Sequence, residues 1–258
     1  MREEERPAFI DIPEEELRSK PRVFTRTIDG ETVVVKQRVK PDMIFVHVFQ
    51  NMLTRLLKDP LMLRTDATPG EKPSEAQKLR LLAENGIRVP KVLHETENYF
   101  IMEYGGENLG EILRDTPDIE RQNEYIRRAL SEMKTMHGKN FVHGGAQIRN
   151  FTFLDDEVYI IDFEEVIPEE YIQSFKIRDL IIFLMSLEKA GAPRGLEWVC
   201  RAYDEMSWRE VLAELVRAIL RYRFLKFLKW RIFSRIRMSD VRASLALIEK
   251  AEMARLDG

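Results

Sequence analysis

Four polar side chains of this 258-residue chain stand where predicted strands and helices begin or end: Lys36, Glu75, Asn150 and Asp162. Asp162 lies between Ile161 and Phe163 at the end of an apolar run, where a charge without a partner would be costly to bury. A triphosphate needs a fixed lysine, and it needs Mg²⁺ held by carboxylate and amide oxygens. The four residue types fit that chemistry, although a single strand-end lysine or helix-start glutamate is more often a solvated surface group.

The first part of the chain predicts a small strand-rich unit with one prominent helix. Asp29-Gly30 is a strong two-residue turn signal between two runs of strand-forming residues, and Ser74 is a good N-cap for the helix that follows it. In chain order we expect a hairpin over 21–39, a helix over 43–58, a helix from Ser74 to Asn85-Gly86, and strands at 89–94 and 99–104.

From residue 107 onward the pattern is mainly helical. The expected elements are helices over 109–113 and 119–137, a loop over 138–150, short strands near 151–154 and 158–161 joined by an Asp155-Asp156 turn, and helices after 170. The sequence therefore predicts an α+β fold of two lobes that divide near Gly105, a β-rich N-terminal lobe (1–104) and a larger helical C-terminal lobe (105–258).

This order of elements, with those polar residues at its joints, resembles the protein-kinase-like fold. The branch that it resembles most is the small bacterial and archaeal one, which holds the lipopolysaccharide (Kdo and heptose) kinases and the atypical kinase subunit of the KEOPS complex. The segments that carry the resemblance are Val33-Val34-Val35-Lys36, the helix that opens with Ser74-Glu75-Ala76-Gln77, His143-Gly144-Gly145-Ala146-Gln147-Ile148-Arg149-Asn150, and Ile160-Ile161-Asp162-Phe163.

The resemblance implies ATP and Mg²⁺ as cofactors and gives roles to six residues. By analogy, Lys36 would contact the α- and β-phosphates, Glu75 would pair with Lys36, Asn150 and Asp162 would ligate Mg²⁺, and the backbone of Glu103 and Tyr104 would meet the adenine edge.

The chain departs from the family pattern at three points. Gly145 stands where the family has the catalytic aspartate that accepts the proton of the acceptor hydroxyl, which glycine cannot do. No glycine-rich stretch precedes Lys36, since Gly30 is the only glycine before it. Asp179 follows Asp162 by only 17 residues, which leaves little room for a peptide-binding platform and disfavours a protein substrate.

Two functions therefore remain open at the level of sequence. One is an atypical phosphotransferase that acts on a small-molecule or lipid-linked sugar hydroxyl, and the other is a pseudokinase scaffold that binds nucleotide or a protein partner without phosphoryl transfer. Acidic residues that follow Asp162 are candidates to ligate a second metal or orient an acceptor, or else form a solvated acidic loop: Glu164, Glu165, Glu169 and Glu170. Gln147 and Arg149 either contact a phosphate or only close their loop.

Charge is distributed unevenly along the chain. The formal net charge is -3, yet residues 217–237 hold eight arginines and lysines and no acidic residue. Such a stretch attracts anionic partners, so we expect contact with an anionic membrane surface as one alternative; nucleic acid is disfavoured because no aromatic stacking platform is evident.

Composition bears on the compartment. A content of 44% hydrophobic residues supports a core, and a single cysteine, Cys200, excludes an internal disulfide and is expected to pack within a helix. The first residues lack the apolar core of a signal peptide, and the apolar stretch Leu180–Leu187 is too short to span a bilayer. These features predict a cytoplasmic protein, with peripheral contact at the inner face of the membrane if residues 217–237 bind lipid.

Overall fold

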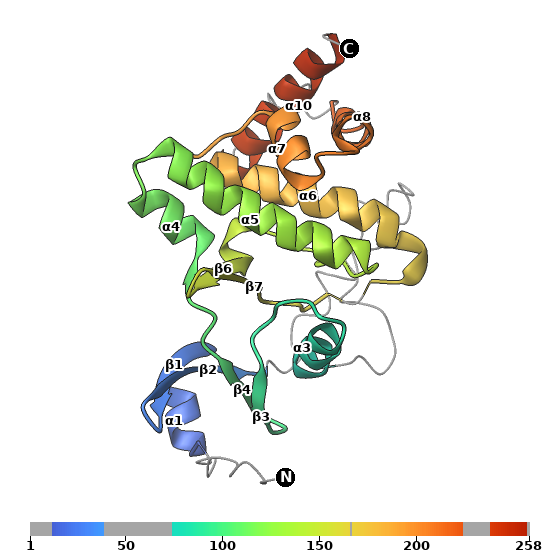
Figure 1. Ribbon diagram of the computed structural model, residues 1–258. Coiled ribbons are helices and arrows are strands. Elements are labelled where there is room, and N and C mark those ends of the chain that lie inside the picture. Colours follow the sequence, from blue (N-terminus) through green and yellow to red (C-terminus); the bar gives the residue numbers. More distant parts are fainter. Residues whose placement is uncertain (1–11, 39–73, 166, 224–237, 257–258) are drawn as a thin grey trace.

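The computed structural model describes residues 12–38, 74–165, 167–223 and 238–256. It shows a small antiparallel sheet with two helices at one end and a mostly helical unit at the other (Figure 1), which confirms the predicted α+β bilobal architecture. The helix expected over 43–58 and most of the basic stretch 217–237 lie outside the described residues.

The N-terminal sheet has the strand order β1-β2-β4-β3, and all its pairs are antiparallel. Its elements are α1 (Glu14–Ser19), β1 (Val23–Ile28), β2 (Glu31–Gln37), α3 (Glu75–Glu84), β3 (Val92–Glu95) and β4 (Tyr99–Glu103). The predicted hairpin and strand pair are thus confirmed, and the predicted division at residue 105 falls between β4 and the first strand of a second sheet.

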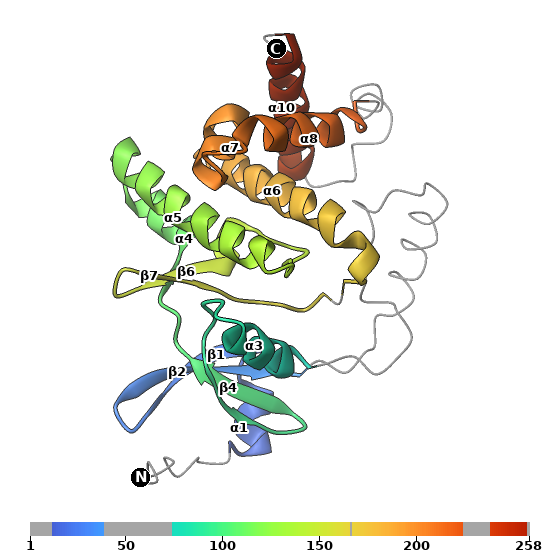
Figure 2. The same cartoon turned by 45° about the vertical axis from the view of Figure 1, so that its right-hand side comes forward.

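The C-terminal part places a second, three-stranded sheet of order β5-β6-β7 beneath a set of helices (Figures 1 and 2). Its elements are β5 (Glu107–Asn108), α4 (Leu109–Asp115), α5 (Ile119–Gly138), a 3-10 turn (Ile148–Asn150), β6 (Phe151–Leu154), β7 (Glu157–Ile160), a second 3-10 turn (Glu169–Tyr171), α6 (Ile172–Lys189), α7 (Leu196–Tyr203), α8 (Trp208–Leu220) and α10 (Met238–Leu256). Both helices and both short strands expected between 107 and 161 are present.

The period of two along β2 decides where Lys36 points. Side chains that alternate along a strand face opposite sides of the sheet. Val33 and Val35 pack with Leu17 of α1 on one side, whereas Val34 belongs to the cluster that contains α3 on the other side. Lys36 shares the side of Val34, so the strand directs it toward α3.

Both hairpin turns use residues that tolerate left-handed backbone. Asp29 and Gly30 have φ of 51° and 86°, and Asp155 and Asp156 have φ of 47° and 63°. Two consecutive residues with positive φ make the two-residue turn whose twist matches the flanking strands. Aspartate and glycine at these positions therefore fix the register of β1 with β2 and of β6 with β7.

The start of α3 is fixed by a reciprocal cap. The Ser74 side chain accepts a hydrogen bond from the Gln77 backbone N–H, and the Gln77 side chain accepts one from the Ser74 N–H at 2.8 Å. Such a capping box satisfies two backbone donors that the first turn leaves open. It also fixes Glu75 as the first residue of the helix, which confirms the role expected of Ser74.

Buried apolar residues join the helices of the C-terminal part into one core. Met133 of α5, Phe183 of α6 and Cys200 of α7 are fully buried members of it. Burial raises the pKa of the Cys200 thiol to about 12, so the thiol stays protonated and the expected packing role is confirmed. Within the described ranges no helix is both long and apolar enough to cross a membrane.

The connection from β4 to β5 depends on glycine at one position. Gly106 has a φ of +89°, and a Cβ added there would lie 1.8 Å from the Phe153 carbonyl oxygen of β6. No neighbouring backbone can yield that much space. The chain can therefore pass from the first sheet to the second at this close distance only without a side chain.

We expect Gly106→Ala to lower the free energy of unfolding by about 3 kcal/mol or more, because it adds left-handed strain and a backbone clash. Urea unfolding followed by circular dichroism would measure this. Gly138→Ala is the control: Gly138 ends α5 and an added Cβ meets nothing within 4 Å, so the change should be neutral or stabilise by up to about 1 kcal/mol. Equal midpoints for Gly106→Ala and wild type would contradict the close approach.

Candidate functional site

Lys36 is the centre of a cluster that three separate elements build. Its Nζ lies 2.8 Å from a carboxylate oxygen of Glu75, at the start of α3, and 2.5 Å from Oδ1 of Asp162, just after β7. The side chains of Lys36 and Glu75 are only 6% and 10% exposed, whereas that of Asp162 is 35% exposed. The lysine is thus fixed from both sides, and Asp162 is the member that solvent can reach.

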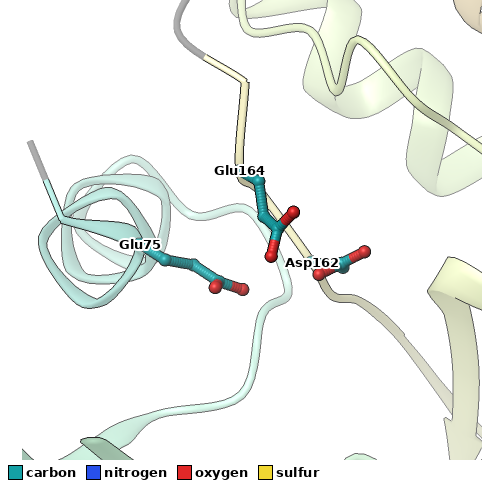
Figure 3. Close-up of side chains that lie close together, drawn as sticks. All are labelled: Glu75, Asp162 and Glu164. Carbon is teal, nitrogen blue, oxygen red and sulfur yellow. The ribbon is translucent and has the colours of Figure 1, made fainter. Parts of the chain in front are cut away.

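Glu164 adds a third carboxylate to the cluster. Oxygen atoms of Glu75, Asp162 and Glu164 all lie within 4.8 Å of one another. Figure 3 shows Glu75 reaching from α3 toward the segment after β7, from which Asp162 and Glu164 project. Mg²⁺ is usually bound by one or two carboxylates together with water and substrate phosphate. Because Asp162 and Glu164 are more exposed than Glu75, this pair fits such an ion.

Opposing effects of burial and charge set the protonation of the cluster. Burial lowers the pKa of Lys36, but the carboxylates of Glu75 and Asp162 outweigh it and raise the pKa above 10.5. Burial raises the pKa of Glu75 above 4.5, and Lys36 offsets this only in part. Burial also opposes the charge of Asp162, yet Lys36 overcomes it and holds the pKa below 3.8. Asp162 is therefore the stable anion of the site.

The backbone around Asp162 is held in an unusual conformation. Asp162 has a φ of +71°, a left-handed value that is uncommon outside glycine and tolerated best by aspartate and asparagine. Lys78 of α3 donates to the carbonyl oxygens of Phe163, Glu164 and Glu165 at 2.9–3.1 Å. The helix that supplies Glu75 thus also fixes the segment that supplies Asp162.

His143 supports the same segment from the opposite side. Its Nε2 donates to the Ile161 carbonyl at 2.8 Å, its Nδ1 accepts from the Gly145 N–H at 3.2 Å, and its ring stacks on Phe163 with centroids 4.7 Å apart. One donor and one acceptor nitrogen define the neutral imidazole. His143 thus packs and hydrogen-bonds within the loop that leads to Asn150.

A buried carboxylate anchors this loop to α6. Asp179 is fully buried, and its Oδ2 accepts the backbone N–H of His143 at 2.8 Å and lies 3.2 Å from Nε2 of His137. The second nitrogen of His137 contacts the Tyr203 hydroxyl at 2.8 Å. Through these contacts the helical core fixes the position of residues 143–150 relative to the cluster around Lys36.

Asn150 is oriented by its own loop. It is 5% exposed, and its Nδ2 donates to the Gly145 carbonyl at 2.9 Å. This bond uses the amide nitrogen and leaves Oδ1 as the atom that can accept or ligate. The role predicted for Asn150, a neutral oxygen ligand of Mg²⁺, needs that atom.

The two adjacent glycines differ in their tolerance of a side chain. Gly144 has a φ of +83°, and an added Cβ would lie 2.9 Å from a Glu165 carboxylate oxygen. Gly145 has no such φ, and its added Cβ would meet only Nδ1 of His143 at 3.9 Å. The position at which the resemblance requires an aspartate therefore accepts a Cβ without a close contact.

The other acidic and loop candidates lie in different surroundings. Glu165 pairs with Arg178 of α6 at 3.2 Å, and Glu169 and Glu170 are exposed in the 3-10 turn before α6. The Gln147 carbonyl accepts from the Asn150 N–H at 2.9 Å, as the loop-closing alternative requires. Of the four glutamates proposed as extra ligands, the structure brings Glu164 to the cluster.

The predicted adenine-edge residues border a cavity. A hollow of about 700 Å³ lies between the β1–β2 turn, the end of β4 and the β6–β7 turn, and its lining includes Pro90, Ile101, Glu103, Tyr104 and Gly105. A cavity with apolar walls and a few polar groups is typical of a ligand site. The structure therefore places Glu103 and Tyr104 on the wall of a cavity of suitable size.

Sequence reasoning missed two cations at the site, Lys78 and Arg22. Lys78 lies three residues after Glu75, so the helical period places both on one face of α3. Arg22 directly precedes β1 and forms an ion pair with Glu164. No local pattern marks that pair, because its members are 142 positions apart.

Comparison with known proteins agrees with this geometry. Residues 67–193 match the RIO domain. This is an atypical protein-kinase-like family, and the matched segment runs from before α3 to just beyond α6, so it includes Glu75, Asn150 and Asp162. Lys36 and the first hairpin precede the match. The kinase-like resemblance is thus supported at the level of the RIO domain, and its lipopolysaccharide-kinase or KEOPS branch stays a prediction.

A relative in Haemophilus influenzae is 31% identical over 116 residues and carries the name "Uncharacterized protein". The aligned part is 44% of this chain and 48% of that protein, so the chain spans about half the length of the relative that it matches. The kinase-like, ATP-binding character of the family comes from the RIO domain match and not from this relative.

We expect Lys36→Met to destabilise the fold in a pH-dependent way. Without the ammonium, the pKa of Glu75 should move further above 4.5, so the folded state binds more protons than the unfolded state and stability falls as pH rises through that window. Loss of one partner of a buried ion pair costs about 3–5 kcal/mol when the other stays charged. Urea unfolding should therefore show that Lys36→Met lowers the free energy of unfolding, relative to wild type, more at pH 8 than at pH 5.

The double variant Lys36→Met/Glu75→Gln serves as the control. It lacks the titrating carboxyl, so its deficit should differ much less between the two pH values. Equal deficits for Lys36→Met at pH 5 and pH 8 would show that Glu75 is not held by Lys36 in solution.

Proposed function

We propose that this protein binds Mg-ATP and transfers its terminal phosphoryl group to a hydroxyl of a small-molecule or lipid-linked sugar. The observation that carries the proposal is the buried Lys36 ammonium, held at 2.8 Å by Glu75 and at 2.5 Å by Asp162. A buried cation fixed by two carboxylates is a costly arrangement for stability alone and a suitable one for phosphate.

In this proposal each residue acts on a separate part of the nucleotide. The ring would occupy the cavity beside Glu103 and Tyr104, and Lys36 would donate to the α- and β-phosphates. Asp162 and the Oδ1 of Asn150 would hold Mg²⁺, with Glu164 as a further carboxylate. The bound ion would bridge phosphate oxygens and neutralise their charge.

The site lacks a carboxylate at residue 145 to accept the proton of the acceptor hydroxyl. Phosphoryl transfer has a loose transition state in which positioning and charge neutralisation dominate, so the remaining groups can support slow transfer. Asp179 follows Asp162 by only 17 positions, and a compact acceptor fits that length better than a polypeptide. These two points support a small acceptor and a low rate.

The second candidate is a pseudokinase that binds nucleotide or a protein partner without phosphoryl transfer. Gly145 favours it, whereas the intact arrangement of Lys36, Glu75 and Asp162 favours retained nucleotide binding in either case. Contact of residues 217–237 with an anionic membrane is part of the proposal on charge alone.

Mg-ATP should raise the melting temperature of the protein. A ligand at about 100 times its Kd stabilises the folded state by about 2.7 kcal/mol. Asp162→Asn should remove most of the shift without unfolding the protein, because asparagine tolerates the left-handed backbone. Asp156→Asn, an exposed carboxylate in the β6–β7 turn that also has positive φ, should leave the shift intact. No shift for wild type at millimolar Mg-ATP would refute nucleotide binding.

Gly145→Asp should increase phosphoryl transfer if the first candidate function is right. A positioned base supplies about 10²- to 10⁴-fold, and residue 145 has no left-handed φ and has space for a Cβ. Turnover would be measured with a panel of sugar and lipid acceptors, with Gly145→Ala as the matched control. If Gly145→Asp binds Mg-ATP but turns over no faster than Gly145→Ala, the pseudokinase function is favoured.

A further inference from the structure

We propose that Arg22 is a phosphate-binding residue of this site, and that Glu164 holds it in place until Mg-ATP enters. The inference rests on the proposed nucleotide binding and adds to it a residue outside the predicted set. It also assigns to the Arg22–Glu164 ion pair a specific exchange: Glu164 turns to Mg²⁺, and the released guanidinium turns to the phosphates.

Strand register places Arg22 beside Lys36. Val23 of β1 is paired with Lys36 of β2, and the Gln37 N–H donates to the Arg22 carbonyl at 2.8 Å. Arg22 is thus the residue at which the chain enters the sheet, one position beyond the partner of Lys36. Its guanidinium shares Oε1 of Glu164 with the ammonium that the proposal assigns to phosphate.

The turn that carries Arg22 is fixed by a side chain of β2. Nε2 of Gln37 lies 2.8 Å from the Leu17 carbonyl, 3.3 Å from that of Lys20 and 3.2 Å from that of Pro21. These contacts join the end of α1 to the strand that holds Lys36. The backbone of Arg22 is therefore held in position, and its side chain alone has to move.

The Arg22–Glu164 pair is built for exchange more than for stability. Nη2 of Arg22 contacts Oε1 of Glu164, and this oxygen also lies 3.5 Å from Nζ of Lys36. The two side chains are 47% and 45% exposed, and ion pairs as exposed as this contribute at most about 1 kcal/mol. Mg²⁺ or a phosphate can therefore replace either partner of the ion pair with little loss of free energy.

The chemistry of both partners matches the two parts of Mg-ATP. A guanidinium offers paired N–H donors that fit phosphate oxygens, and a carboxylate is a preferred ligand of Mg²⁺. Glu164 already lies within 4.8 Å of the oxygens of Asp162. The sequence has no glycine-rich stretch before Lys36 to supply backbone donors, and Arg22 supplies donors on that side of the lysine.

Titration with ATP, with and without Mg²⁺, tests the exchange by isothermal calorimetry. Arg22→Gln should weaken Mg-ATP binding by about 10- to 100-fold, the loss of a charge-assisted hydrogen bond, and should leave adenosine binding unchanged. Glu164→Gln should tighten ATP binding in EDTA, because it frees Arg22 to contact the phosphates. In the same variant, Mg²⁺ should increase the affinity for ATP by a smaller factor than in wild type.

Two further variants separate the exchange from general electrostatics. Arg22→Gln/Glu164→Gln should bind ATP in EDTA no more tightly than Arg22→Gln, because the gain from Glu164→Gln acts through Arg22. Arg18→Gln removes an equally charged side chain of α1 that pairs with Glu14 away from the cluster, and it should bind like wild type.

The outcomes distinguish the inference from the proposed function. If wild type binds no ATP with Mg²⁺, the proposed function fails, and the inference fails with it. If wild type binds Mg-ATP and Arg22→Gln binds it equally well, the inference alone is overturned. If Arg22→Gln weakens adenosine and ATP binding equally, Arg22 is a structural residue. If Arg22→Gln/Glu164→Gln binds ATP in EDTA as tightly as Glu164→Gln does, the exchange is overturned.

Discussion

The structure depends on the charge of one buried ammonium. Lys36 is almost fully buried, and a lysine in that environment stays charged only with carboxylates in direct contact. Those carboxylates come from α3 and from the segment after β7, so the helix, the first sheet and the second sheet must meet at this point. Each of the other local features, from the cap at Ser74 to the left-handed Asp162, serves to bring a partner to that ammonium.

Local chemistry explains why the sequence predicts most of these elements. Aspartate and glycine in the two tight turns and serine at the cap of α3 act within a few residues, and each was predictable. The triad of Lys36, Glu75 and Asp162 was also predictable, but from the resemblance to a kinase-like fold. No periodicity in the chain joins a strand, a helix start and a strand end that are spread over 126 positions.

The contacts that could not be predicted from the sequence are those of long, flexible side chains with residues far away in the chain. Arg22 selects Glu164, and Lys78 selects three backbone carbonyls, only because the two lobes meet as they do. The different tolerance of Gly144 and Gly145 is hidden in the same way, since both are glycine and the backbone angle alone separates them. The helix expected over 43–58 and most of the basic stretch lie outside the described residues, and both stay predictions.

The position of α3 has a mechanical consequence. Lys78 joins this helix to the carbonyls of residues 163–165, and Lys139 of α5 donates to the carbonyls of Asn85 and Gly86 at its other end. The Ile160 N–H adds a bond to the Arg88 carbonyl just after the helix. Since both ends of α3 are attached to the C-terminal lobe, the helix should move with that lobe as one body.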